Sequence, residues 1–299
     1  MSQTCIEPTP LEGISYFQPP PDYRITGRDG RVAIPFEFPI PLNDDDYRIA
    51  LENGGPGYDQ VGRGMFDALR RNPGCVYAVD YARVLQEGYP HIIAEIGGEA
   101  IMLDAKELDA PYLDRKITLL KIMALLEPDN AGLNREIGRT LMEKGSRLEA
   151  CHLAVQSWYG AENYLIRALE LEPDDLSTAY QLGETHYVLG HYDQALELWQ
   201  PLQERLQGDD LTRLTARIES ITRRELPRVP AVDYLTALAV AFEQQQAEQH
   251  YEAIAIVEDV LADTVFCAQF PVAGVYRFLE QCCRAVNLIE KADALRGRY

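Results

Sequence analysis

Residue types that often carry catalysis or bind metal ions are sparse in this sequence and lack a specific spacing. The chain has five histidines and six cysteines, with no CxxC pair and no cysteine at metal-ligand spacing from a histidine. It contains no phosphate-binding glycine loop, no GxGxxG, no GxSxG and no HExxH. His186 and His191 flank a predicted turn, and we interpret all five histidines as turn or packing residues. The sequence therefore predicts no catalytic set, no metal site and no cofactor.

Composition narrows the class of protein. The chain has 299 residues, 46% of them apolar, and a formal net charge of -19. Such acidity argues against nucleic-acid binding or binding to an anionic membrane, because phosphates require basic patches. No apolar run reaches membrane-spanning length, and the first residues do not resemble a secretion signal. We expect a folded cytoplasmic protein with reduced thiols.

The stretch from 174 to 207 predicts two amphipathic helices in a tight hairpin. Apolar residues recur at helical spacing on both sides of a break at Gly190. Pro173 should end the preceding helix, and Asp174 and Asp175 can cap the next one. Gly183 and Ala195 are small, which predicts a close approach of the two helices.

This hairpin resembles a tetratricopeptide repeat. The matching features are Leu182-Gly183, Gly190-x-Tyr192 and Ala195, preceded by Ala168 and Pro173. LEPDN at 126–130 returns as LEPDD at 171–175, and Ile137-Gly138 stands at the family's Leu-Gly position. The resemblance is clearest over residues 131–206 and extends more weakly to the C-terminus. It implies an all-α fold, a solenoid of antiparallel helix hairpins over 131–299.

Residues 1–57 differ from the rest because prolines crowd there and exclude helix through most of the segment. We expect an extended, proline-rich arm that lies on an apolar surface. That surface could belong to its own chain, which we favour, or to a second subunit in a homodimer. Asp44, Asp45 and Asp46 are interpreted as a solvated loop.

Residues 58–130 carry helical patterns with one ambiguous segment. Residues 91–103 can form a β-hairpin around Gly97-Gly98, or a helix that begins at Pro90. We favour the helix because the segments that follow are helical. Between Gly145 and residue 171, the pattern predicts one unusually long helix.

The resemblance also implies a binding surface, since the first helix of each tetratricopeptide hairpin lines a concave groove. The residues carried over to that groove are Arg135, Arg139, Tyr180, Glu184, Tyr187, Phe242, Arg277 and Arg284. The arginines could bind an acidic segment or a C-terminal carboxylate through bidentate pairs. Alternatively, with about equal weight, they form salt bridges to neighbouring helices.

These observations favour a protein–protein interaction scaffold or adaptor that binds a peptide or a partner helix. The alternative is an enzyme, or an accessory subunit of a peptide-modifying system, with a site in residues 1–115 and the repeats as a substrate clamp. An enclosed polar pocket between the arm and residues 104–115 would favour the enzyme, and an open groove would favour the scaffold.

Overall fold

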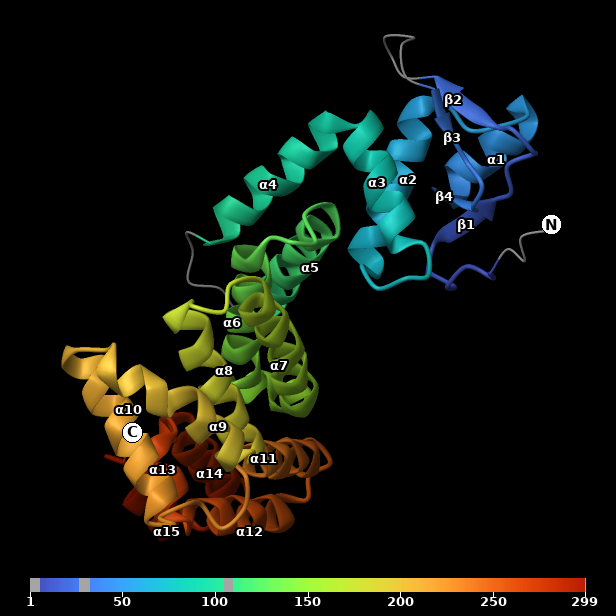
Figure 1. Ribbon diagram of the computed structural model, residues 1–299. Helices are drawn as coiled ribbons and strands as arrows, with labels where there is room; N and C mark the ends of the chain where they lie inside the picture. The colour runs from blue at the N-terminus through green and yellow to red at the C-terminus, as the bar shows by residue number, and fades with distance from the viewer. Residues whose placement is uncertain (1–5, 27–32, 105–109, 299) are drawn as a thin grey trace. The chain divides into compact units, whose positions relative to one another are not determined.

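The computed structural model describes residues 6–26, 33–104 and 110–298 (Figure 1). The chain divides into two compact units, Met1–Leu133 and Asn134–Tyr299. Most described residues are helical, as the sequence predicted. Within the described ranges, no helix combines the length and the apolar character needed to cross a membrane.

The proline-rich segment forms short strands against the helices of its own unit. Strand β1 (Ile14–Phe17) pairs antiparallel with β4 (Ile40–Asn43), and β2 (Arg24–Thr26) pairs antiparallel with β3 (Ala33–Pro35). Strand β4 packs on α2 (Tyr58–Arg71) so closely that a Cβ on Gly64 would overlap the Pro41 carbonyl oxygen. The surface that this segment covers therefore belongs to its own chain.

The interpretation of Asp44, Asp45 and Asp46 as a loop is wrong, because these residues open α1 (Asp44–Asn53). Asn43 caps the helix, and its Oδ1 accepts from the Asp46 N–H at 2.8 Å. Three carboxylates in the first turn lie at the positive end of the helix, where negative charge is stabilising.

Three further helices complete the N-terminal unit: α3 (Ala78–Gly88), α4 (Pro90–Asp104) and α5 (Ala110–Leu126). Helix α4 excludes the alternative β-hairpin at 91–103. Ile92, Ile96, Ala100 and Leu103 recur at helical spacing and are buried. Gly97 and Gly98 lie in open space, so neither is required there for close packing.

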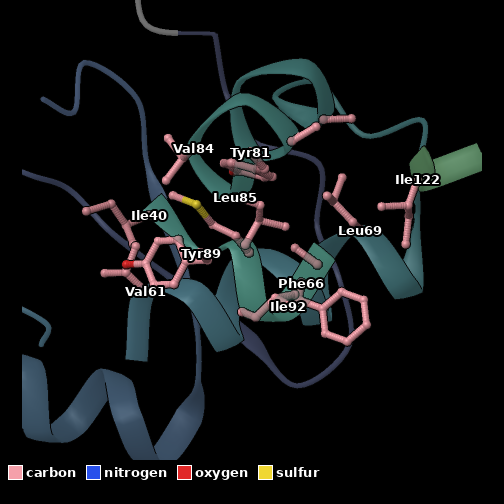
Figure 2. Packing of buried hydrophobic residues seen from close by; sticks show 14 of the residues in the cluster. Ile40, Val61, Phe66, Leu69, Tyr81, Val84, Leu85, Tyr89, Ile92 and Ile122 are labelled. Carbon is pink, nitrogen blue, oxygen red and sulfur yellow. The ribbon is translucent and has the colours of Figure 1, made fainter. Parts of the chain in front are cut away.

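The core of the N-terminal unit joins the strands to α2, α3 and α4 (Figure 2). Its tyrosines bury their rings and use their hydroxyl groups to satisfy backbone carbonyls. Tyr81 donates to the Pro39 carbonyl at 3.1 Å, and Tyr89 donates to the Tyr58 carbonyl at 2.8 Å. These bonds tie the proline-rich segment and α2 to helices that follow later in the chain.

The C-terminal unit is a succession of packed helices (Figure 1). They are α6 (Ala131–Gly145, which starts just before the unit boundary), α7 (Ala154–Leu171), α8 (Leu176–Leu189), α9 (Tyr192–Trp199), α10 (Gly208–Thr222), α11 (Ala231–Gln246), α12 (His250–Leu261), α13 (Thr264–Gln269), α14 (Ala273–Ala285) and α15 (Ile289–Leu295). The prediction of a single long helix after Gly145 is wrong. A 3-10 segment, Leu148–Leu153, precedes α7.

The α8–α9 hairpin confirms the local predictions. Asp175 caps α8, and Gly190 ends it with a left-handed φ of 83°. A Cβ on Gly183 would overlap the Trp199 indole, whose Nε1 donates to the Tyr180 carbonyl at 3.1 Å. Ala195 is fully buried. Small residues at these positions therefore allow the two helices to approach each other closely.

Replacing Gly183 with alanine should destabilise the C-terminal unit, because the new methyl group must displace the buried indole. Overpacking of this kind costs about 1–3 kcal/mol. Urea unfolding followed by tryptophan fluorescence measures this unit specifically, since the two tryptophans of the chain, Trp158 and Trp199, both lie in it. Ser177→Ala on the exposed side of α8 is the control and should shift stability by less than about 0.5 kcal/mol. Equal stability of the two variants would contradict the close contact.

Candidate functional site: a pocket between α8, α10 and α13

A pocket of about 470 Å³ in the C-terminal unit contains two of the predicted groove residues. Its lining comes from three helices and consists of Tyr180, Glu184, Arg213, Ala216, Arg217, Ser220, Ala268 and Gln269. Tyr180 and Glu184 lie four residues apart on α8 and therefore share one face. Arg213 and Arg217 have the same spacing on α10.

Tyr187 contacts two residues that line this pocket, Arg217 and Gln269. Its side chain is fully buried, so it does not line an open groove as the resemblance implied. The hydroxyl donates to Gln269 Oε1 at 2.6 Å, which links α8 to the end of α13. The Arg217 guanidinium lies 4.5 Å from the centroid of the Tyr187 ring. A cation–π contact and a hydrogen bond thus fix two residues of the lining.

Glu184 and Arg217 set the electrostatics of the pocket. Their nearest atoms, Oε1 and Nε, are 3.8 Å apart, and both side chains are mostly buried. Burial raises the pKa of Glu184, although the Arg217 charge and a hydrogen bond from Tyr180 act in the opposite direction. Arg217 Nη1 is buried and has no hydrogen-bond partner among the described residues. A buried donor without a partner is costly, so this atom favours an added acceptor.

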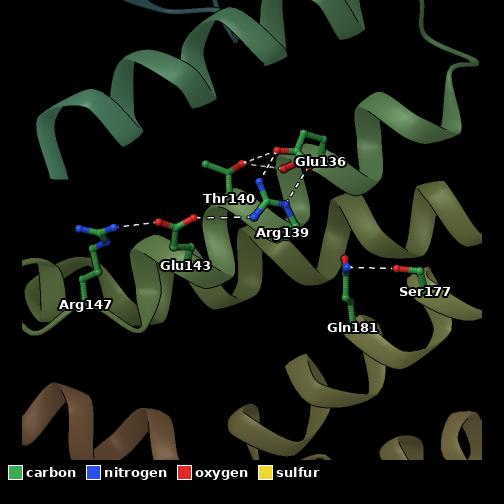
Figure 3. A network of polar contacts seen from close by, with 7 residues as sticks. All are labelled: Glu136, Arg139, Thr140, Glu143, Arg147, Ser177 and Gln181. Carbon is green, nitrogen blue, oxygen red and sulfur yellow. Dashed lines mark hydrogen bonds and ion pairs between the residues drawn. The ribbon is translucent and has the colours of Figure 1, made fainter. Parts of the chain in front are cut away.

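The remaining predicted arginines mostly form ion pairs within the C-terminal unit. Arg135 Nη1 lies 2.5 Å from Asp175 Oδ2, and Arg284 Nη2 lies 2.8 Å from Asp293 Oδ1. Figure 3 shows Arg139 between Glu136 and Glu143, with the closest contact, to Glu136, at 2.6 Å. For these three arginines the structure favours the alternative in which they pair with nearby carboxylates.

Arg277 and Phe242 complete the predicted set and do not line the pocket. Arg277 is exposed on α14. The Phe242 ring packs against Phe278 with a centroid separation of 4.2 Å, at the edge of the core that α11, α12 and α14 share. The structure thus brings together Tyr180, Glu184 and Tyr187 from the predicted set.

Sequence analysis did not single out Arg213 and Arg217, because the resemblance to the repeat family weakens beyond residue 206. Two arginines at helical spacing, with the small residues Ala216 and Ser220 on the same face, were the available signal. The structure also places ligand atoms of Glu162, His186 and His191 within 4.8 Å of one another. The sequence spacing of these three residues fits no standard metal motif.

A second pocket, of about 710 Å³, lies in the N-terminal unit between residues 34–38 and α3. Its charged residues are Glu37, Asp80, Arg83 and Glu87, with Asp80 and Arg83 paired at 2.6 Å. Burial raises the pKa of Cys75, which disfavours a reactive thiolate in this unit. An enclosed polar pocket between the proline-rich arm and residues 104–115 would favour an enzyme. Residues 105–109 of that range lie outside the described residues.

No protein-family model matches this sequence, and no curated protein is significantly similar to it.

Replacing Glu184 with glutamine should raise the free energy of unfolding, relative to that of wild type, more at pH 7 than at pH 4. A carboxyl group whose pKa is raised by folding stabilises the folded state below its unfolded pKa of about 4.3, and this contribution is lost as pH rises through the folded pKa. Glutamine does not ionise, so the variant avoids that loss. Urea unfolding of both proteins at several values from pH 4 to pH 7, followed by tryptophan fluorescence, measures the difference. A difference that stayed constant, or changed in the opposite direction, would contradict the raised pKa.

Proposed function

We propose that this chain is a tetratricopeptide-type scaffold or adaptor that binds a carboxylate-bearing peptide segment at the pocket between α8, α10 and α13. The observation that carries the proposal is Arg217, whose buried Nη1 has no acceptor among the described residues. A ligand carboxylate supplies that acceptor, and the planar guanidinium favours bidentate pairing with it.

The neighbouring residues suit a peptide ligand. Tyr180 offers a ring and a hydroxyl group, and tyrosine and arginine are enriched among residues that dominate binding energy at interfaces. Gln269 offers an amide whose oxygen already accepts from Tyr187. Arg213 stands at the rim with 70% of its side chain exposed and lies 3.7 Å from Asp210 on the same helix, so its guanidinium can also contact a ligand carboxylate.

The acidity of the chain does not oppose this contact strongly. At physiological ionic strength, charges separated by more than about 8 Å in solvent are largely screened. Remote carboxylates therefore affect a bound peptide much less than the two arginines in the pocket do. Acidity elsewhere also disfavours non-specific binding of other anions.

Binding should depend on the arginines of the pocket and not on arginines in general. Peptides selected from a displayed random library should be enriched in Asp, Glu or a free C-terminal carboxylate. Arg213→Glu should weaken a selected peptide at least about tenfold, equivalent to about 1.4 kcal/mol, because it removes an attractive charge and adds a repulsive one. Fluorescence anisotropy with a labelled peptide measures the Kd.

Arg223→Glu is the matched control, since Arg223 follows the same helix, is 61% exposed and lies outside the pocket lining. It should leave the Kd within about twofold, a difference of about 0.4 kcal/mol. Arg217→Lys tests the guanidinium itself, because it keeps the charge and removes the bidentate fork. Selected peptides without acidic groups, or equal effects of Arg213→Glu and Arg223→Glu, would refute the proposed ligand class.

A further inference from the structure

A carboxylate and two imidazoles converge where α7 faces the turn between α8 and α9. Glu162 comes from α7, His186 from the last turn of α8, and His191 from the residue just before α9. Glu162 Oε1 lies 3.1 Å from His186 Nδ1 and 3.4 Å from His191 Nδ1. One ligand atom from each residue lies within 4.8 Å of both others.

These separations match those between ligands of one metal ion. Zinc bonds to histidine nitrogen and carboxylate oxygen are about 2.0–2.1 Å long, so adjacent ligand atoms in a tetrahedral site lie about 3.3 Å apart. Both distances from Glu162 are close to that value. His191 is the most exposed of the three, with 36% of its side chain accessible, so its ring can rotate to shorten its distance from His186.

One carboxylate faces the Nδ1 atoms of two imidazoles in this cluster. The Nδ1 atoms of His186 and His191 are buried and lack a hydrogen-bond partner among the described residues, although the Glu162 carboxylate is close to both. Two buried ring nitrogens that face one carboxylate at these distances can share a cation with it.

We propose that Glu162, His186 and His191 bind one divalent transition-metal ion, with Zn²⁺ as the simplest candidate. The donor set of two imidazoles and one carboxylate suits zinc and related ions and does not suit Mg²⁺ or Ca²⁺, which prefer oxygen ligands. Three protein ligands leave at least one coordination position for water or for an added ligand.

Metal binding joins two elements that the hairpin alone does not connect. Glu162 belongs to the helix before α8, whereas His186 and His191 lie on both sides of the Gly190 turn. A bound ion therefore fixes the end of α8 against α7. Tyr180 and Glu184 on the same helix line the pocket with α10 and α13 instead, so the metal site and the peptide pocket lie on different faces of α8 and can be tested separately.

The test measures Zn²⁺ binding to the full chain after treatment with a chelator, in competition with a chromophoric indicator. Wild type should bind one ion per chain, and millimolar Mg²⁺ should not displace it. His191→Ala and Glu162→Gln should each weaken binding by at least about tenfold, since changes even to supporting groups around a metal cost about 10- to 100-fold in affinity. His152→Ala, which removes an exposed histidine of the same unit, is the matched control and should bind as wild type does.

Tryptophan fluorescence and circular dichroism show whether each variant is folded, and His191 is exposed enough that its replacement should preserve the fold. Cobalt substitution identifies the ligands, because nitrogen and oxygen donors give visible bands without thiolate-to-metal charge transfer. A charge-transfer band would instead place the ion on cysteines and overturn the assignment. Absence of saturable Zn²⁺ binding in wild type, or equal affinity of wild type and His191→Ala, would also overturn it.

Discussion

The contact between Gly183 and the Trp199 indole fixes the position of α8, on which both candidate sites depend. Because glycine has no side chain, the indole lies directly on the helix backbone and its Nε1 bonds to the Tyr180 carbonyl. With that face closed against α9, the other faces of α8 are available to other partners. Glu184 faces Arg217 of α10, whereas His186 faces Glu162 of α7. A single well-packed helix therefore presents two different chemistries in opposite directions.

Charge composition explains why three of the four predicted groove arginines form ion pairs with nearby carboxylates. The chain has 47 acidic residues against 28 lysines and arginines, so a surface arginine readily finds a carboxylate nearby. Arg135 pairs with the same Asp175 that caps α8, and burial of this carboxyl is outweighed by hydrogen bonds from Thr178, Arg135 and Ser177 that keep its pKa low. Arg217 differs because its guanidinium lies over the Tyr187 ring and reaches Glu184 only at 3.8 Å.

The elements that the sequence predicted well are those determined by near neighbours along the chain. Pro173, the Asp175 cap, Gly190 and the small residues of the α8–α9 hairpin all act within a few residues of their position, and each has the expected role. Residues 44–46 were misinterpreted although their signal was also local. Asn43 followed by three aspartates is a strong helix start, whereas the prolines just before it disfavour helix and predict extended backbone.

The candidate sites were harder to predict because their residues meet only through packing between helices. Arg217 contacts Glu184 of α8, although α9 and a further segment separate the two residues in the sequence. Gln269 of α13 lies still later in the chain and contacts Tyr187 of α8. Glu162 and His186 likewise come together because α7 packs against α8. The sequence spacing of the two residues does not predict this contact. A periodic pattern predicts which face of a helix is apolar, but it does not predict which helix the polar residues will contact. Side-chain sites that span several helices thus require the packing to be known first, whereas caps and turns do not.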